Sequence, residues 1–127
     1  MGPGEDLDGV DLDGVDLWTT NLDGADLTGS NLTHVLSGPK PGIKGVPTLP
    51  SEWKLISGFL FGPGTNLLLE ILPDGLDLTG VNLTDAELPA YMIGANLTDV
   101  NLTGTDLTGV TWSNTTCPDG TVTNTGC

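Results

Sequence analysis

Residues 6–17 read DLDGVDLDGVDL, so that leucine returns at every fifth position. The same period continues to residue 32 and returns between residues 78 and 112. Asp or Asn usually stands directly before the leucine, and a small or β-branched residue usually stands two places before it. The residues of this series are Leu7, Leu12, Leu17, Leu22, Leu27, Leu32, Leu78, Leu83, Leu88, Met92, Leu97, Leu102, Leu107 and Trp112.

A period of five fits neither an α-helix nor a straight strand. Five steps along an α-helix advance by about 500°, so successive leucines would point to all sides. On a straight strand, an odd spacing sends alternate leucines to opposite faces. A chain that turns a corner in every repeat keeps all of them inside, and Gly, Asp and Asn are the residues that turns favour. Short tandem units of this kind indicate a solenoid whose core is this column of leucines.

The tandem strings resemble the A-(D/N)-L-x-x signature of the pentapeptide-repeat family. Clear examples are GADLTGSNL at residues 24–32, GVNLTDAEL at residues 80–88 and GANLTDVNLTGTDLTGV at residues 94–110. The resemblance covers roughly residues 5–36 and 76–112. It implies an all-β fold, a right-handed quadrilateral β-helix in which four pentapeptides make one coil.

With four pentapeptides per coil, residues twenty apart are expected to stack, with Leu7 under Leu27. Between Leu88 and Leu97 one residue is missing from the period if Met92 takes the central place. The second block is therefore expected to stack at a spacing of nineteen.

The whole chain, residues 1–127, is predicted to be a single β-helix domain. Its parts are a first repeat block (5–36), an enlarged non-repeat coil (37–62), a second repeat block (63–112) and a C-terminal disulfide cap (113–127). The segment 37–62 breaks the period and holds all three lysines. Its apolar residues are too many for a linker, so we expect Trp53 and Phe59 to pack on the core.

Cys117 and Cys127 are the only cysteines of the chain, and they lie just after the last repeat. A zinc site needs about four ligands, whereas His34 is the sole histidine. The spacing also lacks a CxxC redox motif. We expect a disulfide that closes a lid over the last coil, with two free buried thiols as the open alternative. A disulfide indicates an oxidising compartment, hence an extracellular or cell-surface protein.

The charge of the chain argues against two classes of partner. The formal net charge is −14 and no arginine is present, which disfavours binding to nucleic acid or to an anionic membrane. No apolar run approaches the ~20 residues of a membrane span. Catalysis needs a nucleophile beside a base, or a matched acid pair in a pocket, and the repeats offer no such arrangement. We therefore expect neither an enzyme nor a cofactor.

The acidic residues leave alternative functions open. Eight acids precede any base, and Asp6 and Asp26 are expected to stack as a like-charge pair that Ca²⁺ could relieve. DLDGVDLDG lacks the ligand order of an EF-hand, however. Some members of the family are acidic rods that resemble duplex DNA and occupy DNA gyrase. A ladder of threonines, Thr79 near Thr98, could suit ice or crystal surfaces.

The sequence favours a structural or protein-interaction module above these alternatives. We expect an extracellular spacer or display module, cut from a longer repeat protein, whose protein partner is unidentified. We also expect the first coil to expose its strand edges and the undersides of Leu7, Leu12, Leu17 and Leu22. Weak homodimerisation through this N-terminal coil would follow, because unpaired strand edges invite pairing with another chain.

Overall fold

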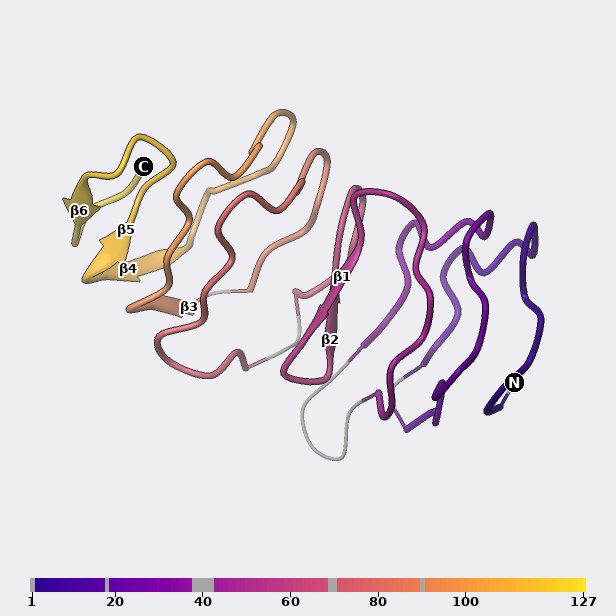
Figure 1. Cartoon of the computed structure of the whole chain (residues 1–127). Coiled ribbons are helices and arrows are strands. Elements are labelled where there is room, and N and C mark those ends of the chain that lie inside the picture. Colours follow the sequence, from indigo (N-terminus) through magenta and orange to yellow (C-terminus); the bar gives the residue numbers. More distant parts are fainter. Residues whose placement is uncertain (1, 18, 38–42, 69–70, 90) are drawn as a thin grey trace.

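The computed structural model describes residues 2–17, 19–37, 43–68, 71–89 and 91–127, which form strands and turns (Figure 1). Stretches of chain stack along one axis, with the N-terminus at one end and the C-terminus at the other. No helix occurs in these ranges, and so none could span a membrane. The five-residue period therefore builds an all-β structure of the β-helix type.

The strands that are long enough to be named lie outside the regular repeats. Strands β1 and β2 form an antiparallel hairpin, β3 pairs with β4 in parallel, and β5 and β6 form a second antiparallel hairpin. Their bounds are β1 (Lys54–Ile56), β2 (Phe59–Phe61), β3 (Tyr91–Ile93), β4 (Thr111–Ser113), β5 (Thr115–Thr116) and β6 (Val122–Thr123). The repeats themselves contact the next coil through single parallel bridges.

These bridges confirm the stacking at twenty residues in the first block. Asp6 pairs with Asp26, and Asp11 pairs with Asn31. Farther along, Leu36 pairs with Asn66, thirty positions later. The extra residues include the β1–β2 hairpin and the range 38–42, which lies outside the described residues.

The spacing of nineteen in the second block is also confirmed. Asp77 pairs with Asn96, and Asn82 pairs with Asn101. The repeat that is one residue short contains β3, which pairs in parallel with β4. In that pair Met92 lies opposite Trp112, so both stay in the core column. The missing residue therefore shifts the register without turning a core side chain outward.

The series of leucines points into two buried clusters. One contains Leu7 to Leu32 of the first block, and the other contains Leu78 to Leu97 together with Met92 and Trp112. Leu102 and Leu107 are half-buried at the edge of the second cluster. Phe59 is buried in the second cluster and Trp53 is partly buried against the first, as expected for a segment that packs on the core.

The expectation that the first coil exposes the undersides of its leucines is wrong. Leu7 and Leu12 are only 7% and 4% exposed, and Leu17 and Leu22 are fully buried. These side chains pack in one cluster with the leucines of the second coil, and this packing shields them from solvent. The leucine side chains of the first coil are therefore buried by residues of this chain itself.

Candidate functional site

The outward face of the repeats is built from turns that each centre on an Asp or Asn side chain. In five of them, and in a sixth turn within the C-terminal hairpin, one side-chain oxygen accepts hydrogen bonds from both the backbone N and the Oγ1 of the threonine two residues later. Asp77 accepts both from Thr79, at 3.1 and 2.6 Å. The pairs are Asp26–Thr28, Asp77–Thr79, Asn82–Thr84, Asn96–Thr98, Asn101–Thr103 and Asp119–Thr121. Such local bonds fix the corner of each repeat.

The threonine bonds hold several carboxylates in the ionised form. The pKa values of Asp26, Asp77 and Asp119 are lowered from 3.8, first by the threonine hydroxyl and then by the threonine backbone N–H. For Asp106 the order is reversed, because the backbone N–H of Thr108 contributes most to the lowered pKa. The outward face thus stays negatively charged well below neutral pH.

Replacing Thr79 by Val should raise the pKa of Asp77 towards 3.8, because the larger of its two stabilising hydrogen bonds is lost. Thr108→Val is the matched control, and it should raise the pKa of Asp106 less, because the hydroxyl that it removes contributes less there than the backbone N–H that it keeps. NMR titration of the carboxyl carbons measures both values. Since the folded pKa lies below the unfolded one, the ionised carboxylate stabilises the fold above about pH 4. That contribution is lost as the pH falls through the folded pKa. Equal shifts at both sites would contradict this assignment.

The acidic block does not gather into a metal site. Asp6 and Asp26 are bridged neighbours, but each carboxylate accepts a hydrogen bond from a backbone N–H of its own turn, from Asp8 at 3.1 Å and from Thr28 at 3.0 Å. Among the described residues, no three His, Cys, Asp or Glu side chains come close enough to hold a metal ion. The expected stacking of Asp6 and Asp26 is present.

A side-chain hydrogen bond joins the turns of two neighbouring coils. His34 Nδ1 lies 2.8 Å from Asp13 Oδ1, and both side chains are about half exposed. Sequence reasoning missed this pair. The signal was available, because stacking at twenty residues brings the turn at Asp13 beside the turn at His34.

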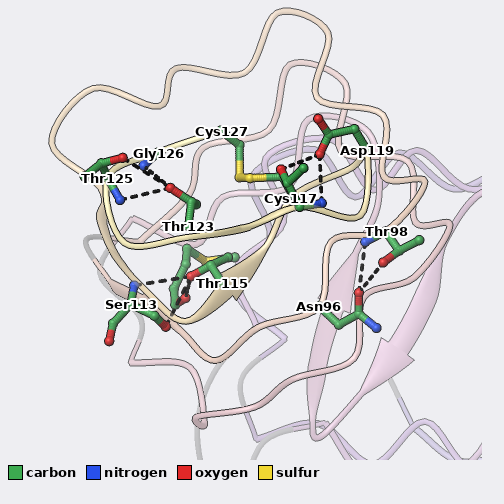
Figure 2. Close-up of a disulfide and its surroundings, with 12 residues drawn as sticks. Asn96, Thr98, Ser113, Thr115, Cys117, Asp119, Thr123, Thr125, Gly126 and Cys127 are labelled. Atoms are coloured by element: carbon green, nitrogen blue, oxygen red, sulfur yellow. Dashed lines mark hydrogen bonds between the residues drawn. A yellow bond between two sulfur atoms is a disulfide. The ribbon is translucent and has the colours of Figure 1, made fainter.

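The C-terminal lid is a short hairpin closed by a disulfide (Figure 2). Cys117 and Cys127 are joined, with their Cα atoms 5.5 Å apart. Asn114 N donates to Asn124 Oδ1 at 2.8 Å, which ties the two arms of the hairpin together. The buried hydroxyl of Thr115 donates to the carbonyl of Met92 in the coil below. The hairpin is thus bonded both to itself and to the β3 segment.

A shallow hollow lies beside the β1–β2 hairpin. It has a volume of about 390 Å³ and is lined mainly by apolar residues, with Lys54 as its ionisable side chain. Val46 on its rim is 80% exposed.

Comparison with known families settles the class of the repeats. A family model for pentapeptide repeats matches residues 6–36 and 90–116, in eight copies. The chain is a pentapeptide-repeat protein. Proteins built from pentapeptide repeats are generally structural or interaction proteins.

Two solved structures of pentapeptide-repeat proteins are similar to this chain. HetL, involved in heterocyst differentiation regulation in the cyanobacterium Nostoc sp., shares 25% identity over 95% of this chain, with a TM-score of 0.30. This chain spans 42% of the length of HetL. Rfr23 from the cyanobacterium Cyanothece shares 24% identity, with a TM-score of 0.26, over 84% of this chain and 83% of Rfr23. A comparison with curated proteins gives no match.

The structure brings most of the predicted site residues of this pentapeptide-repeat protein together. The leucine series lies in the two core clusters, and the two cysteines lie in the lid. Sequence reasoning missed the buried hydroxyls that connect irregular segments. Thr65 Oγ1 donates to the carbonyl of Leu60 at 2.8 Å, and Ser37 Oγ accepts from Leu60 N at 2.9 Å. These residues stand at breaks in the period, where no pattern marks them.

Proposed function

We propose that this pentapeptide-repeat protein is a non-enzymatic spacer or display module at the cell surface or outside the cell, with a protein as its partner. Its proposed architecture is a right-handed quadrilateral β-helix, one domain over residues 1–127. The spacing of thirty between Leu36 and Asn66 supports one enlarged coil over residues 37–62. We also retain weak homodimerisation through the N-terminal coil as a proposal, because strand edges attract partners even where the leucines are buried.

The Cys117–Cys127 disulfide is the observation that carries the extracellular part of this proposal. Disulfides persist in oxidising compartments and are rare in the cytosol. The rest of the molecule suits a rigid rod, since coils are joined by repeated backbone hydrogen bonds and their corners are fixed by Asx turns. Such a rod presents side chains at fixed positions without a binding cleft.

The alternative is an acidic mimic of duplex DNA that occupies DNA gyrase. The formal net charge of −14 favours it. Duplex DNA carries one charge per about 1.7 Å of axis. A protein that mimics it therefore needs to be a long, evenly charged rod. Residues 111–127 form strands β4, β5 and β6 in place of the C-terminal helix through which gyrase-binding members of the family dimerise. The disulfide also favours a compartment that gyrase does not occupy.

Fractionation of the native host separates the two candidates. We expect the protein in the extracellular or surface fraction. Mass spectrometry without reduction should then give a mass two hydrogens below that of the dithiol form. Recovery from the cytosol with two alkylatable thiols would contradict the spacer proposal and move the gyrase alternative to first place.

A further inference from the structure

The β1–β2 hairpin lies in the middle of the stack, between the two core clusters (Figure 1). Leu60 of β2 belongs to the first cluster, whereas Phe59 and Phe61 on either side of it belong to the second. In β1, Leu55 packs against the first cluster and Ile56 against the second. Successive side chains of a strand point to opposite faces, so each face of the hairpin covers one cluster. The backbone groups that the hairpin does not pair within itself lie along its two outer edges.

The outer edge of β2 is closed by side-chain hydroxyls. Leu60 N donates to Ser37 Oγ at 2.9 Å, and Leu60 O accepts from Thr65 Oγ1 at 2.8 Å. Both backbone groups of Leu60 therefore point away from β1. Leu60 lies opposite Leu55, and two opposite residues of an antiparallel pair either exchange both backbone hydrogen bonds or exchange neither. Leu55 N and O consequently point away from β2.

The outer edge of β1 is open. Within the part of the chain that the structure describes, no hydrogen bond beyond the hairpin uses Leu55 N or Leu55 O. Repeats follow the chain on both sides of β1, so this edge belongs to the interior of the sequence. An unpaired strand edge is a template for pairing with a further strand.

The shallow hollow of about 390 Å³ lies beside this edge. Its lining comes from two segments, β1 itself and residues 45–49 of the non-repeat coil. The second segment is fixed to the first block, because Val46 N donates to Asp23 Oδ1 at 3.1 Å and Val46 O accepts from Gly24 N at 3.2 Å. A strand added to β1 at the usual spacing of about 4.8 Å would bring its side chains to this hollow.

The charge of this region is opposite to that of the rest of the chain. Residues 37–62 hold all three lysines and one acid, Glu52, whereas the rest of the chain holds every other acid and no lysine or arginine. Lys54 lines the hollow. The pKa of Asp77 is lowered mainly by its bonds to Thr79 and in smaller part by Lys54, so this ammonium acts on carboxylates near it. An acidic partner would be attracted here and repelled by the acidic repeats.

We propose that the open edge of β1 binds an extended, acidic segment of a partner protein as an added strand. Leu55 N and O would form the backbone hydrogen bonds, aliphatic side chains of the segment would contact Val46 and Leu49, and a carboxylate would lie at Lys54. In this mode of recognition the backbone bonds supply affinity and the side-chain contacts supply selectivity. The proposal rests on the part of the proposed function that names a protein partner, and it does not depend on the compartment.

A small molecule fits the same place less well. Sites for small ligands bury most of the surface of the ligand, whereas Val46 on the rim of this hollow is 80% exposed. The unpaired N–H and C=O of Leu55 also stand on one residue of a strand, with the spacing that another backbone offers.

NMR titration of the isotope-labelled full chain tests the contact. The probes are three blocked peptides that differ only in charge, acetyl-QVEVEVQ-amide, acetyl-QVQVQVQ-amide and acetyl-QVKVKVQ-amide. Their valines alternate with the variable residues, so that valines share the face of Leu55 and charges share the face of Lys54. We expect the acidic peptide to shift the amide signals of Val46, Leu49 and Leu55, and to bind about tenfold more tightly than the basic one.

Hydrogen exchange in the same complex reports on the backbone bonds. Exchange at the Leu55 amide should slow about tenfold when the acidic peptide is bound. Exchange at the Leu60 amide should not change, because that amide is already bonded to Ser37.

Backbone methylation of the acidic peptide separates strand pairing from side-chain contact alone. Alternate amides of an added strand face β1, and the amides between them face away. N-methylation of one alternate set should abolish binding, whereas N-methylation of the other set should preserve it. Equal effects of the two sets would overturn the added strand.

Three variants locate the contact on the protein. Val46→Asp adds a carboxylate at the rim and should weaken binding of the acidic peptide about tenfold. Val122→Asp, at a valine that is 65% exposed and outside the hollow, should leave binding unchanged. Lys54→Gln should remove the preference for the acidic over the neutral peptide.

Two results would overturn the proposal outright. One is the absence of shifts at Val46, Leu49 and Leu55 with all three peptides at millimolar concentration. The other is the appearance of the same shifts without peptide as the protein concentration rises, which would identify a second copy of the chain as the occupant. Recovery of the protein from the cytosol would contradict the extracellular spacer and leave these binding results standing.

Discussion

Leu83→Asp should unfold the second core cluster. The leucine side chain is fully buried among its neighbours, and its backbone N donates to Asn101 O in the next coil at 2.9 Å. A carboxylate there would be buried without a partner, which costs more than about 4 kcal/mol and is comparable to the whole stability of a small domain. Urea denaturation followed by circular dichroism should show loss of the cooperative transition, or a midpoint near zero denaturant.

Leu102→Asp is the matched control, because Leu102 stacks one coil above Leu83 and makes the same kind of contact. Leu102 is half-buried at the edge of the second cluster, so the new carboxylate can reach water and the variant should stay folded with reduced stability. Tyr91→Asp, at a side chain that is 58% exposed, should cost less than about 1 kcal/mol. Similar losses of stability in all three variants would contradict a column of inward-pointing leucines in which Leu83 is fully buried and Leu102 is half-buried.

This difference between Leu83 and Leu102 shows what a repeat pattern predicts and what it leaves out. The period of five places both leucines in one column, since all repeats obey the same backbone geometry. The exposure of each leucine depends on which segment packs over it. At the end of the second block, that segment lies outside the regular repeats. The hairpin that begins at Thr115 covers the side at Asn96 and not the side at Asn101. Its path follows from contacts between distant residues, which no local pattern records.

The breaks between blocks were hard to predict for the same reason. Within a block, each hydrogen bond repeats at a fixed spacing, so one repeat predicts the next. At residues 59–65 the chain leaves that spacing, and Ser37 and Thr65 satisfy the backbone of Leu60 with side-chain hydroxyls. Serine and threonine are common in turns everywhere. Their role at these positions becomes visible only when the coils are stacked.

Gly45→Ala should give the largest loss of stability among the glycine positions of the turns. Gly45 has φ +87°, a conformation that L-residues rarely adopt. A Cβ atom at this position would lie less than 3.0 Å from the Cα, Cβ and N atoms of Asp23. Most of these are backbone atoms, which cannot rotate away. Backbone strain of about 1 kcal/mol and overpacking of about 1–3 kcal/mol together predict a loss of about 2–4 kcal/mol.

The close approach at Gly45 is held by hydrogen bonds on both sides of it. Leu22 N donates to Lys44 O at 2.9 Å, and Gly24 N donates to Val46 O at 3.2 Å. Moving the chain outward to make room for a methyl group would lengthen both bonds and detach the non-repeat segment from the first block. The effect should therefore appear in hydrogen exchange as faster exchange at the amides of Leu22 and Gly24.

Gly9→Ala separates backbone strain from the close approach. Gly9 has φ +77°, similar to that of Gly45, but no atom lies within 4 Å of its added Cβ. The control should therefore lose only the conformational part, about 1 kcal/mol, and should leave exchange at Leu22 and Gly24 unchanged. Urea denaturation of the two variants gives the difference. Equal losses of stability would mean that the positive φ alone requires glycine at position 45. Asp23 would then move enough to make room for the methyl group.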